Sequence, residues 1–290
     1  MKSRLATLTL TAATAMVLVV LGGAGSVAAS STTTGFASAT GTAESNETAR
    51  AGNGDSAGIP STGIDPPLLD TAGTQPLQIV TSGGSMNDFL SSVMADVDAY
   101  WSDVWASTER PTPYVNYAFP LPGEAVMSAC TETGVSDDTS AYYCASDDMI
   151  VVSQQFAILV WNGAIKANPD LTERRPTGDF SVAFVVAHEY AHSLQAELGW
   201  VTPVGLAYPG YKIELHADCW AGVWANAAYY EGILESGDIE EAVQTALDLG
   251  DYYVTDPGHH GTPAQRSGAF LAGYNGGTQE SCETYLSNEY

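Results

Sequence analysis

The run His188-Glu189-Tyr190-Ala191-His192 combines two imidazoles and a carboxylate at a spacing typical of a zinc-binding helix. Residues four apart in an α-helix lie on the same face about one turn apart, so both imidazoles can reach one ion. A glutamate between them lies beside the metal, where it can take a proton from a bound water. The alternative, a metal-free core, leaves a buried glutamate without a partner, which is costly. The run therefore predicts zinc ligands at His188 and His192 and a general base at Glu189.

A catalytic zinc site of this kind needs a third protein ligand and keeps one position open. Glu214 and His216 are the candidates, both in a stretch with helical periodicity over residues 213–230. Glu214 and Asp218 are four residues apart and share one face of that helix. We expect Glu214 to bind the metal, and Asp218 to accept the free N–H of a zinc-binding histidine, which fixes its tautomer. His216 points about 200° away from Glu214 and is expected to be a packed or partly exposed histidine.

Two histidines and an arginine follow further along the chain. An imidazole near the zinc can donate a hydrogen bond to the oxyanion of a tetrahedral intermediate, and His260 is the candidate. Its neighbour His259 competes for this role, and a loop histidine without a catalytic role is the remaining alternative. Arg266 is one of few basic residues, and we expect it to pair with an acid such as Asp218 or Glu231.

Hydrophobic periodicity indicates the elements that position these residues. The helix that carries the histidine pair spans residues 180–198, with Gly178-Asp179 as its start signal and Gly199 as its stop signal. Further helices are predicted over residues 86–105, 155–167, 213–230 and 239–249, and strands over residues 114–119 and 149–152. The fold class is therefore α+β, helix-rich with a small sheet.

The N-terminus has the features of an export signal. Lys2 and Arg4 precede an apolar run over residues 5–21, and Val27-Ala28-Ala29 offers a signal-peptidase site. Residues 1–29 are therefore predicted to be a signal peptide of a secreted or extracytoplasmic protein. The alternative is a membrane anchor formed by residues 5–21, and we expect contact with a membrane only if this segment stays uncleaved.

Residues 30–85 are rich in Ser, Thr, Gly and Ala and show no sustained helical or strand periodicity. Such a segment cannot bury enough apolar surface to offset its ordering entropy. It is predicted to be a disordered low-complexity linker or a propeptide, followed by a folded domain over residues 86–290.

The net charge argues against one class of partner, and the cysteine content predicts disulfides. The 290-residue chain is 45% apolar, which supports a sizeable core, and its net charge of −25 argues against nucleic acid as a partner. An even number of cysteines in an exported chain predicts two disulfides, with three possible pairings. The cysteines are Cys130, Cys144, Cys219 and Cys282. They include no C-x-x-C pair, which makes thiol ligands to zinc a weaker interpretation.

Four segments together resemble the bacterial Putative neutral zinc metallopeptidase family. They are residues 178–180 (GDF), 188–195 (HEYAHSLQ), 214–222 (ELHADCWAG) and 260–266 (HGTPAQR), and the likeness covers about residues 86–290. The resemblance implies zinc ligation by His188, His192 and Glu214, with Glu189 as the general base. The chain departs from the family pattern at Ala191, where glycine is usual, and at His216, where glutamine is frequent.

The resemblance also implies features outside the ligand set. It implies a zincin-like arrangement, in which a strand above the active helix pairs with an extended substrate, and Met149–Val152 is the candidate for that edge. It further implies the disulfides Cys130–Cys144 and Cys219–Cys282.

The expected function is that of an exported zinc-dependent endopeptidase, which cleaves peptide or protein substrates with metal-activated water and Glu189 as the base. One alternative is a non-catalytic exported zinc protein that binds a surface partner, with His216 as a possible fourth ligand. Another is an amidase that acts on cell-wall peptides. Substrate preference and oligomeric state have no sequence signal that we can identify.

Overall fold

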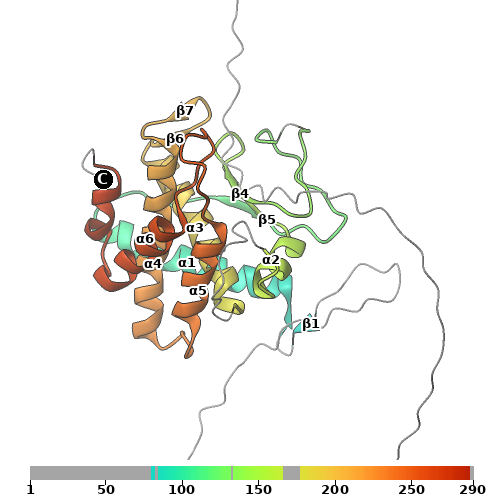
Figure 1. Ribbon diagram of the computed structural model, residues 1–290, viewed down its shortest axis with the longest axis horizontal. Coiled ribbons are helices and arrows are strands. Elements are labelled where there is room, and N and C mark those ends of the chain that lie inside the picture. Colours follow the sequence, from blue (N-terminus) through green and yellow to red (C-terminus); the bar gives the residue numbers. More distant parts are fainter. Residues whose placement is uncertain (1–79, 82–83, 132, 166–176, 288–290) are drawn as a thin grey trace, which may run out of the picture. The chain divides into compact units, whose positions relative to one another are not determined.

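The computed structural model describes residues 80–81, 84–131, 133–165 and 177–287. The predicted signal peptide, the alternative membrane anchor and nearly all of the predicted linker lie outside the described residues. The described part is helix-rich with small sheets, as the sequence predicts (Figure 1). No helix within these ranges has the length and apolar character needed to cross a membrane.

Six α-helices and one 3₁₀-helix make up most of the described structure. They are α1 (Met86–Ser107), α2 (Gln154–Trp161), α3 (Asp179–Glu197), α4 (Gly210–Glu231), α5 (Asp238–Leu249), α6 (Pro263–Gly276) and η1 (Gln279–Tyr285). The five helices whose ranges were predicted are all present, with ends shifted by a few residues. The predicted helix over 155–167 is shorter as α2, because it ends at Asn162 and is followed by Gly163 with a left-handed φ of 61°.

The strands form one mixed sheet and two short hairpins within the described ranges. The sheet holds β3 (Asn116–Ala118), β4 (Ala141–Cys144) and β5 (Met149–Val152) in the order β3-β5-β4. β5 is parallel to β3 and antiparallel to β4. The hairpins are β1 (Val80–Thr81) with β2 (Gly84–Ser85), and β6 (Val201–Thr202) with β7 (Gly205–Leu206).

The expectation that Met149–Val152 is an edge strand is wrong. As β5 it is the central strand, so its backbone groups on both sides are used by β3 and β4. The antiparallel edge of this sheet is β4, a segment for which the sequence predicts no strand. The hairpin β1–β2 lies in the range assigned to the linker, so the described structure begins before residue 86.

Helix α3 lies at the centre of the core. Every residue from Phe180 to Gln195 is buried, and α1, α2, α4, α5 and the mixed sheet all pack against this helix (Figure 1). A helix that is covered on all sides places its polar side chains out of bulk water. The histidine pair and Glu189 are therefore held in the protein interior.

Helices α4 and α6 cross at backbone contact distance. A Cβ added at Gly222 of α4 would lie 2.1 Å from the carbonyl oxygen of Phe270 in α6, which is too close for any side chain. Gly273 of α6 is equally constrained, because its Cβ would lie 1.8 Å from the carbonyl oxygen of Cys219. The Cys219–Cys282 disulfide ties α4 to the segment that follows α6. This crossing fixes α4, which carries the predicted third ligand, against α6.

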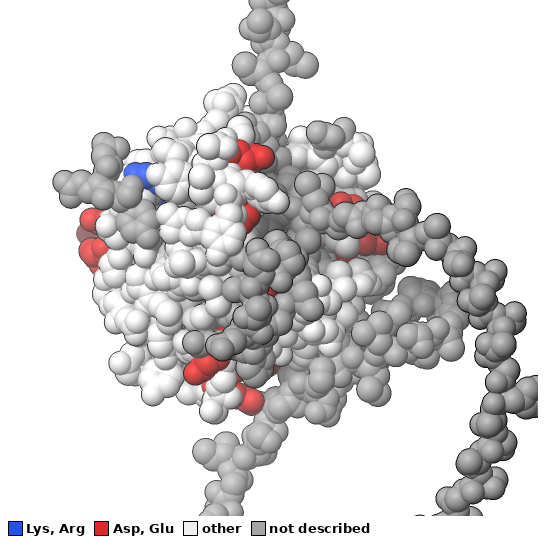
Figure 2. Space-filling view, in the orientation of Figure 1, with Lys and Arg blue, Asp and Glu red and all other residues white. Residues whose placement is uncertain are grey.

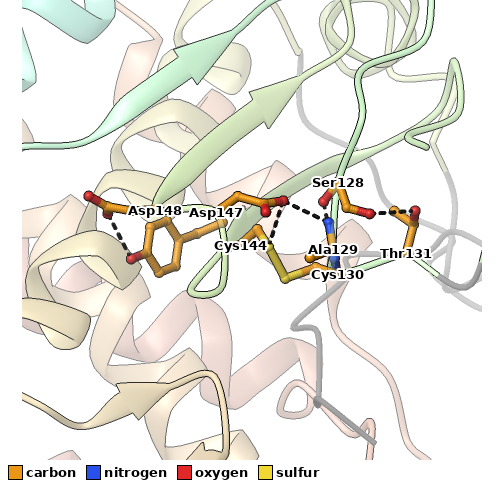
Figure 3. Close-up of a disulfide and its surroundings, with 8 residues drawn as sticks. Ser128, Ala129, Cys130, Thr131, Cys144, Asp147 and Asp148 are labelled. Atoms are coloured by element: carbon orange, nitrogen blue, oxygen red, sulfur yellow. Dashed lines mark hydrogen bonds between the residues drawn. A yellow bond between two sulfur atoms is a disulfide. The ribbon is translucent and has the colours of Figure 1, made fainter. Parts of the chain in front are cut away.

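The second disulfide joins Cys130 to Cys144 and ties a long loop to β4 (Figure 3). The carboxylate of Asp147 accepts a hydrogen bond from the Ala129 backbone N–H at 2.8 Å and reinforces this connection. Both disulfides therefore have the pairing that the family resemblance implies. On the face seen in Figure 2, acidic side chains occur at several separate places, in keeping with the strongly negative net charge.

Candidate metal centre

Helices α3 and α4 bring the three predicted ligands together. His188 and His192 come from α3 and Glu214 from α4, all three are buried, and one ligand atom of each lies within 4.8 Å of the others. The two histidine Nε2 atoms are 3.1 Å apart. The Glu214 carboxylate lies 3.2 Å from His188 Nε2 and 3.6 Å from His192 Nε2. Two imidazole nitrogens and a carboxylate therefore converge on one point.

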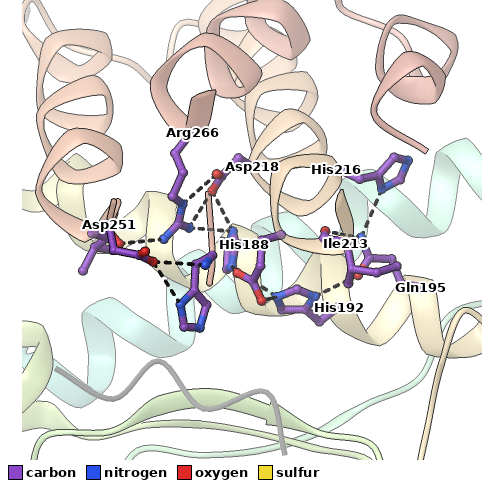
Figure 4. A network of polar contacts seen from close by, with 11 residues as sticks. His188, His192, Gln195, Ile213, His216, Asp218, Asp251 and Arg266 are labelled. Atoms are coloured by element: carbon purple, nitrogen blue, oxygen red, sulfur yellow. Dashed lines mark hydrogen bonds and ion pairs between the residues drawn. The ribbon is translucent and has the colours of Figure 1, made fainter. Parts of the chain in front are cut away.

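Asp218, itself paired with Arg266, contacts the Nδ1 atom of His188, on the side of the ring away from the other candidate ligands (Figure 4). Asp218 Oδ1 lies 2.8 Å from His188 Nδ1, and both oxygens of Asp218 accept hydrogen bonds of 2.8 Å from the Arg266 guanidinium. Of the two acids expected for Arg266, the structure uses Asp218. Burial alone lowers the pKa of His188, but the carboxylates of Asp218 and Glu214 outweigh it and raise this pKa to about 9.

His192 has a different, uncharged support that is not among the predicted site residues. Its Nδ1 lies 2.8 Å from Gln195 Oε1, and Gln195 Nε2 lies 3.0 Å from the Ile213 carbonyl oxygen and 3.1 Å from His216 Nδ1 (Figure 4). Gln195 is three residues after His192, which puts both on one helix face. His216 is buried outside the cluster of candidate ligands, so the structure places it neither at the surface nor as a fourth ligand.

The predicted general base Glu189 is also buried. Burial raises the pKa of its carboxyl group, and the charges of His188 and His192 lower it in part. Its carboxylate is thus close enough to the candidate ligands to feel their charge. A raised pKa makes this carboxylate a better proton acceptor near neutral pH than an exposed glutamate.

Asp251 organises the loop between α5 and α6 through contacts with both neighbouring histidines. Its carboxylate lies 2.6 Å from His259 Nδ1 and accepts a hydrogen bond of 3.1 Å from the His260 backbone N–H. The His259 ring is thereby held by Asp251 and packs near Tyr211. The His260 side chain is 22% exposed, and its Nδ1 lies 3.9 Å from an oxygen of Asp251. Burial lowers the pKa of the His260 imidazole, and the Glu214 carboxylate opposes this effect.

The chemistry of the donor set fits zinc. Both histidine Nδ1 atoms face acceptors, Asp218 for one and Gln195 for the other, so each Nδ1 carries a hydrogen. Both Nε2 atoms are then left for a metal ion, together with the Glu214 carboxylate, whose pKa lies well below its ordinary value. Two histidines and a glutamate form one of the ligand sets that catalytic zinc uses.

Comparison with known proteins agrees with this donor set. Residues 70–285 match the model of the family described as Putative neutral zinc metallopeptidase. The chain is 26% identical over 220 residues to the uncharacterized protein YpfJ of Escherichia coli K12, covering 68% of this chain and 70% of YpfJ. It is 29% identical over 214 residues to the uncharacterized protein Rv2575 of Mycobacterium tuberculosis H37Rv, covering 65% of this chain and 67% of Rv2575. No solved structure matches it. The chain therefore belongs to the Putative neutral zinc metallopeptidase family.

Proposed function

We propose that this protein is an exported zinc-dependent endopeptidase in which His188, His192 and Glu214 hold the metal. The observation that carries the proposal is the buried convergence of these three side chains in a chain of a zinc metallopeptidase family. Glu189, which follows His188 in the sequence, is also buried. Two disulfides support a location outside the cytoplasm, because such bonds persist in oxidising compartments.

Zinc, when bound, lowers the pKa of a coordinated water to about 7 and polarises a substrate carbonyl. Glu189 accepts the proton that the attacking water loses and then delivers it to the leaving nitrogen. Its position between the two histidines in the sequence suits this transfer, and its raised pKa brings its proton affinity closer to neutral pH. Asp218 and Gln195 keep the two imidazoles oriented while the proton moves.

His260 is our candidate donor to the developing oxyanion. Burial lowers the pKa of its imidazole, with Glu214 opposing this effect, so the ring is neutral near pH 7 and keeps one N–H to donate. Asp251 holds the backbone of His260 in place through a hydrogen bond of 3.1 Å. A preorganised donor of this kind is worth about 10²–10³ in kcat when it contacts the oxyanion.

The peptide substrate is proposed to pair with β4, the antiparallel edge of the mixed sheet. The Ser153 N–H donates to the Ser140 carbonyl at 2.9 Å, which shows where this ladder is hydrogen-bonded. Because hydrogen-bonded and non-hydrogen-bonded positions alternate along an antiparallel pair, Ala141 and Tyr143 turn their backbone groups away from β5. Ala141 and Tyr143 are 0% and 3% exposed, so an extended peptide can add to this edge as a further strand only once the edge is uncovered.

The decisive test compares the wild-type protein with Glu189→Gln on a mixed peptide library, with zinc quantified in both. We expect one zinc ion in each and cleavage only by the wild type. Glu197→Gln, an exposed position on the same helix, is the matched control and should cleave like the wild type. Equal cleavage by Glu189→Gln would refute the mechanism. Zinc in both without cleavage in either would favour a non-catalytic zinc protein, and cleavage of cell-wall peptides alone would favour an amidase.

A further inference from the structure

We infer that Gln195 and His216 are positioning residues that act together on the zinc ligand His192. Neither residue belongs to the cluster of candidate ligands. They form a hydrogen-bonded relay from α4 to α3 that fixes the tautomer and the orientation of the His192 ring. This inference rests on the proposed zinc centre. It assigns a role to His216, a buried polar side chain that the mechanism above leaves unused, and explains what orients Gln195.

The orientation of the Gln195 amide is forced by its partners. An amide side chain offers one acceptor oxygen and one NH₂ group with two hydrogens. The Ile213 carbonyl oxygen, 3.0 Å from Gln195 Nε2, can only accept, so the NH₂ group must face it. Oε1 must then face His192 Nδ1, 2.8 Å away, and His192 must carry its hydrogen on Nδ1. The Nε2 atom of His192 is consequently the one left for the metal.

His216 completes this arrangement by accepting the second hydrogen of the NH₂ group. Its Nδ1 lies 3.1 Å from Gln195 Nε2, so all hydrogen-bonding groups of the Gln195 side chain are used. Gln195 is fully buried and His216 is 1% exposed, and an unmade hydrogen bond at such sites costs about 1–3 kcal/mol. His216 is thus a polar residue in the core because it is the acceptor that Gln195 requires.

The His216 ring is itself held by aromatic neighbours. The ring centroids of Trp220 and Trp200 lie 4.2 Å and 5.4 Å from the His216 centroid. The two tryptophan rings therefore orient His216. His216 and the Ile213 carbonyl group then orient Gln195, and Gln195 in turn orients His192. Figure 4 shows Gln195 next to both His192 and His216.

The two zinc histidines then differ in the charge of their supports. His188 has a carboxylate, Asp218, whereas His192 has a neutral amide. The site already contains the carboxylates of Glu189 and Glu214 in addition to Asp218. A neutral support for His192 fixes the ring without adding another buried negative charge, which would be costly.

The relay is tested by zinc affinity, measured in competition with a chromophoric chelator, and by the absorption spectrum of the Co²⁺-loaded protein. Gln195→Leu is expected to weaken zinc binding by about 10–100-fold and to change the Co²⁺ spectrum. His216→Leu, which removes only the acceptor, is expected to cause a smaller loss. His216→Gln keeps an acceptor oxygen and should bind zinc like the wild type. In the Gln195→Leu background, His216→Leu should cause no further loss.

A purely structural role for His216 predicts a different pattern. The leucine and glutamine replacements would then be equivalent, and the two leucine substitutions would act additively on zinc affinity. Either result would overturn the relay. Unchanged zinc affinity in Gln195→Leu, with a wild type that binds zinc and cleaves peptides, would overturn the relay alone. A wild type that does not bind zinc would overturn both the relay and the proposed function.

A measurement on the wild type covers the case in which a variant does not fold. In the zinc-loaded, ¹⁵N-labelled protein, the His192 ring should show a hydrogen on Nδ1 that exchanges slowly with water in NMR spectra. Rapid exchange of this hydrogen, or a hydrogen on Nε2, would contradict the relay.

Discussion

Replacing Asp218 by asparagine is expected to weaken the fold and the zinc site through two different partners. Asp218 is fully buried, and it lies 2.8 Å from His188 Nδ1 while both its oxygens accept hydrogen bonds of 2.8 Å from Arg266. Removing one partner of a buried ion pair costs about 3–5 kcal/mol, because the other charge remains buried. Loss of the group that orients a metal ligand costs about 10–100-fold in metal affinity.

A double replacement separates these two effects. In Asp218→Leu/Arg266→Met both buried charges are replaced by apolar side chains, a change that is often neutral or stabilising. We expect the double variant to recover most of the free energy of unfolding that Asp218→Asn loses. It should still bind zinc about 10–100-fold more weakly than the wild type, because the double variant leaves His188 Nδ1 with no side-chain acceptor at position 218.

Both quantities can be measured on the same preparations. The free energy of unfolding is obtained by urea denaturation of the zinc-free protein with its disulfides intact, because bound zinc would add to the apparent stability. Zinc affinity is obtained by chelator competition. A loss of less than 1 kcal/mol in Asp218→Asn, or wild-type zinc affinity in the double variant, would refute this reasoning.

Three further predictions concern protons, acidic groups and helix packing. Because the pKa of His188 is raised to about 9, zinc binding at pH 7.5 should release about one proton from His188 in addition to the proton lost by the coordinated water. At pH 10 only the proton of the water should be released, as measured by calorimetry in buffers of different ionisation enthalpy. Burial and nearby carboxylates raise the pKa of Glu241 from 4.5 to about 7, so its contribution to stability is present below pH 4.5 and is lost as the pH rises through 7. Glu241 is half-buried, and Glu241→Gln should therefore raise the free energy of unfolding of the protein by about 1 kcal/mol at pH 8 and leave it unchanged at pH 4. Urea denaturation at the two pH values measures this difference. Gly222→Ala should lower the free energy of unfolding by at least about 3 kcal/mol, because its Cβ would lie 2.1 Å from a carbonyl oxygen of α6, whereas Gly268→Ala, which meets nothing within 4 Å, should be neutral or slightly stabilising.

The helices and the candidate ligand set were predictable because both depend on local spacing. A four-residue separation places His188 with His192 on one face of α3, and Glu214 with Asp218 on one face of α4, whatever the rest of the fold does. The structure then needs only to bring these two faces together. Continuous apolar composition around the histidines indicated a buried helix, and α3 is buried throughout residues 180–195.

The sheet was predicted less well because the order of strands depends on pairing between distant segments. The composition of Met149–Val152 is that of a buried strand, and it is the same for a strand in the centre of a sheet and for one at its edge. Its central position results from β3, which lies about 30 residues upstream in the sequence and pairs with it in parallel. Gln195 was missed for a related reason, since its spacing places it beside His192 but its other partners, Ile213 and His216, lie on α4.

The choice of acid for Arg266 shows how tertiary packing decides between two partners that the sequence leaves open. Three contacts between α4 and α6 share an offset of 48 residues: Asp218–Arg266, Gly222–Phe270 and Asn226–Tyr274. At this offset Glu231 faces position 279, which is beyond Gly276, the last residue of α6. Glu231 therefore cannot reach Arg266, whereas Asp218 lies one helical turn before the glycine contact and receives the guanidinium directly. The small glycines that let the two helices touch thus also determine which carboxylate neutralises Arg266 beside the proposed zinc ligand His188.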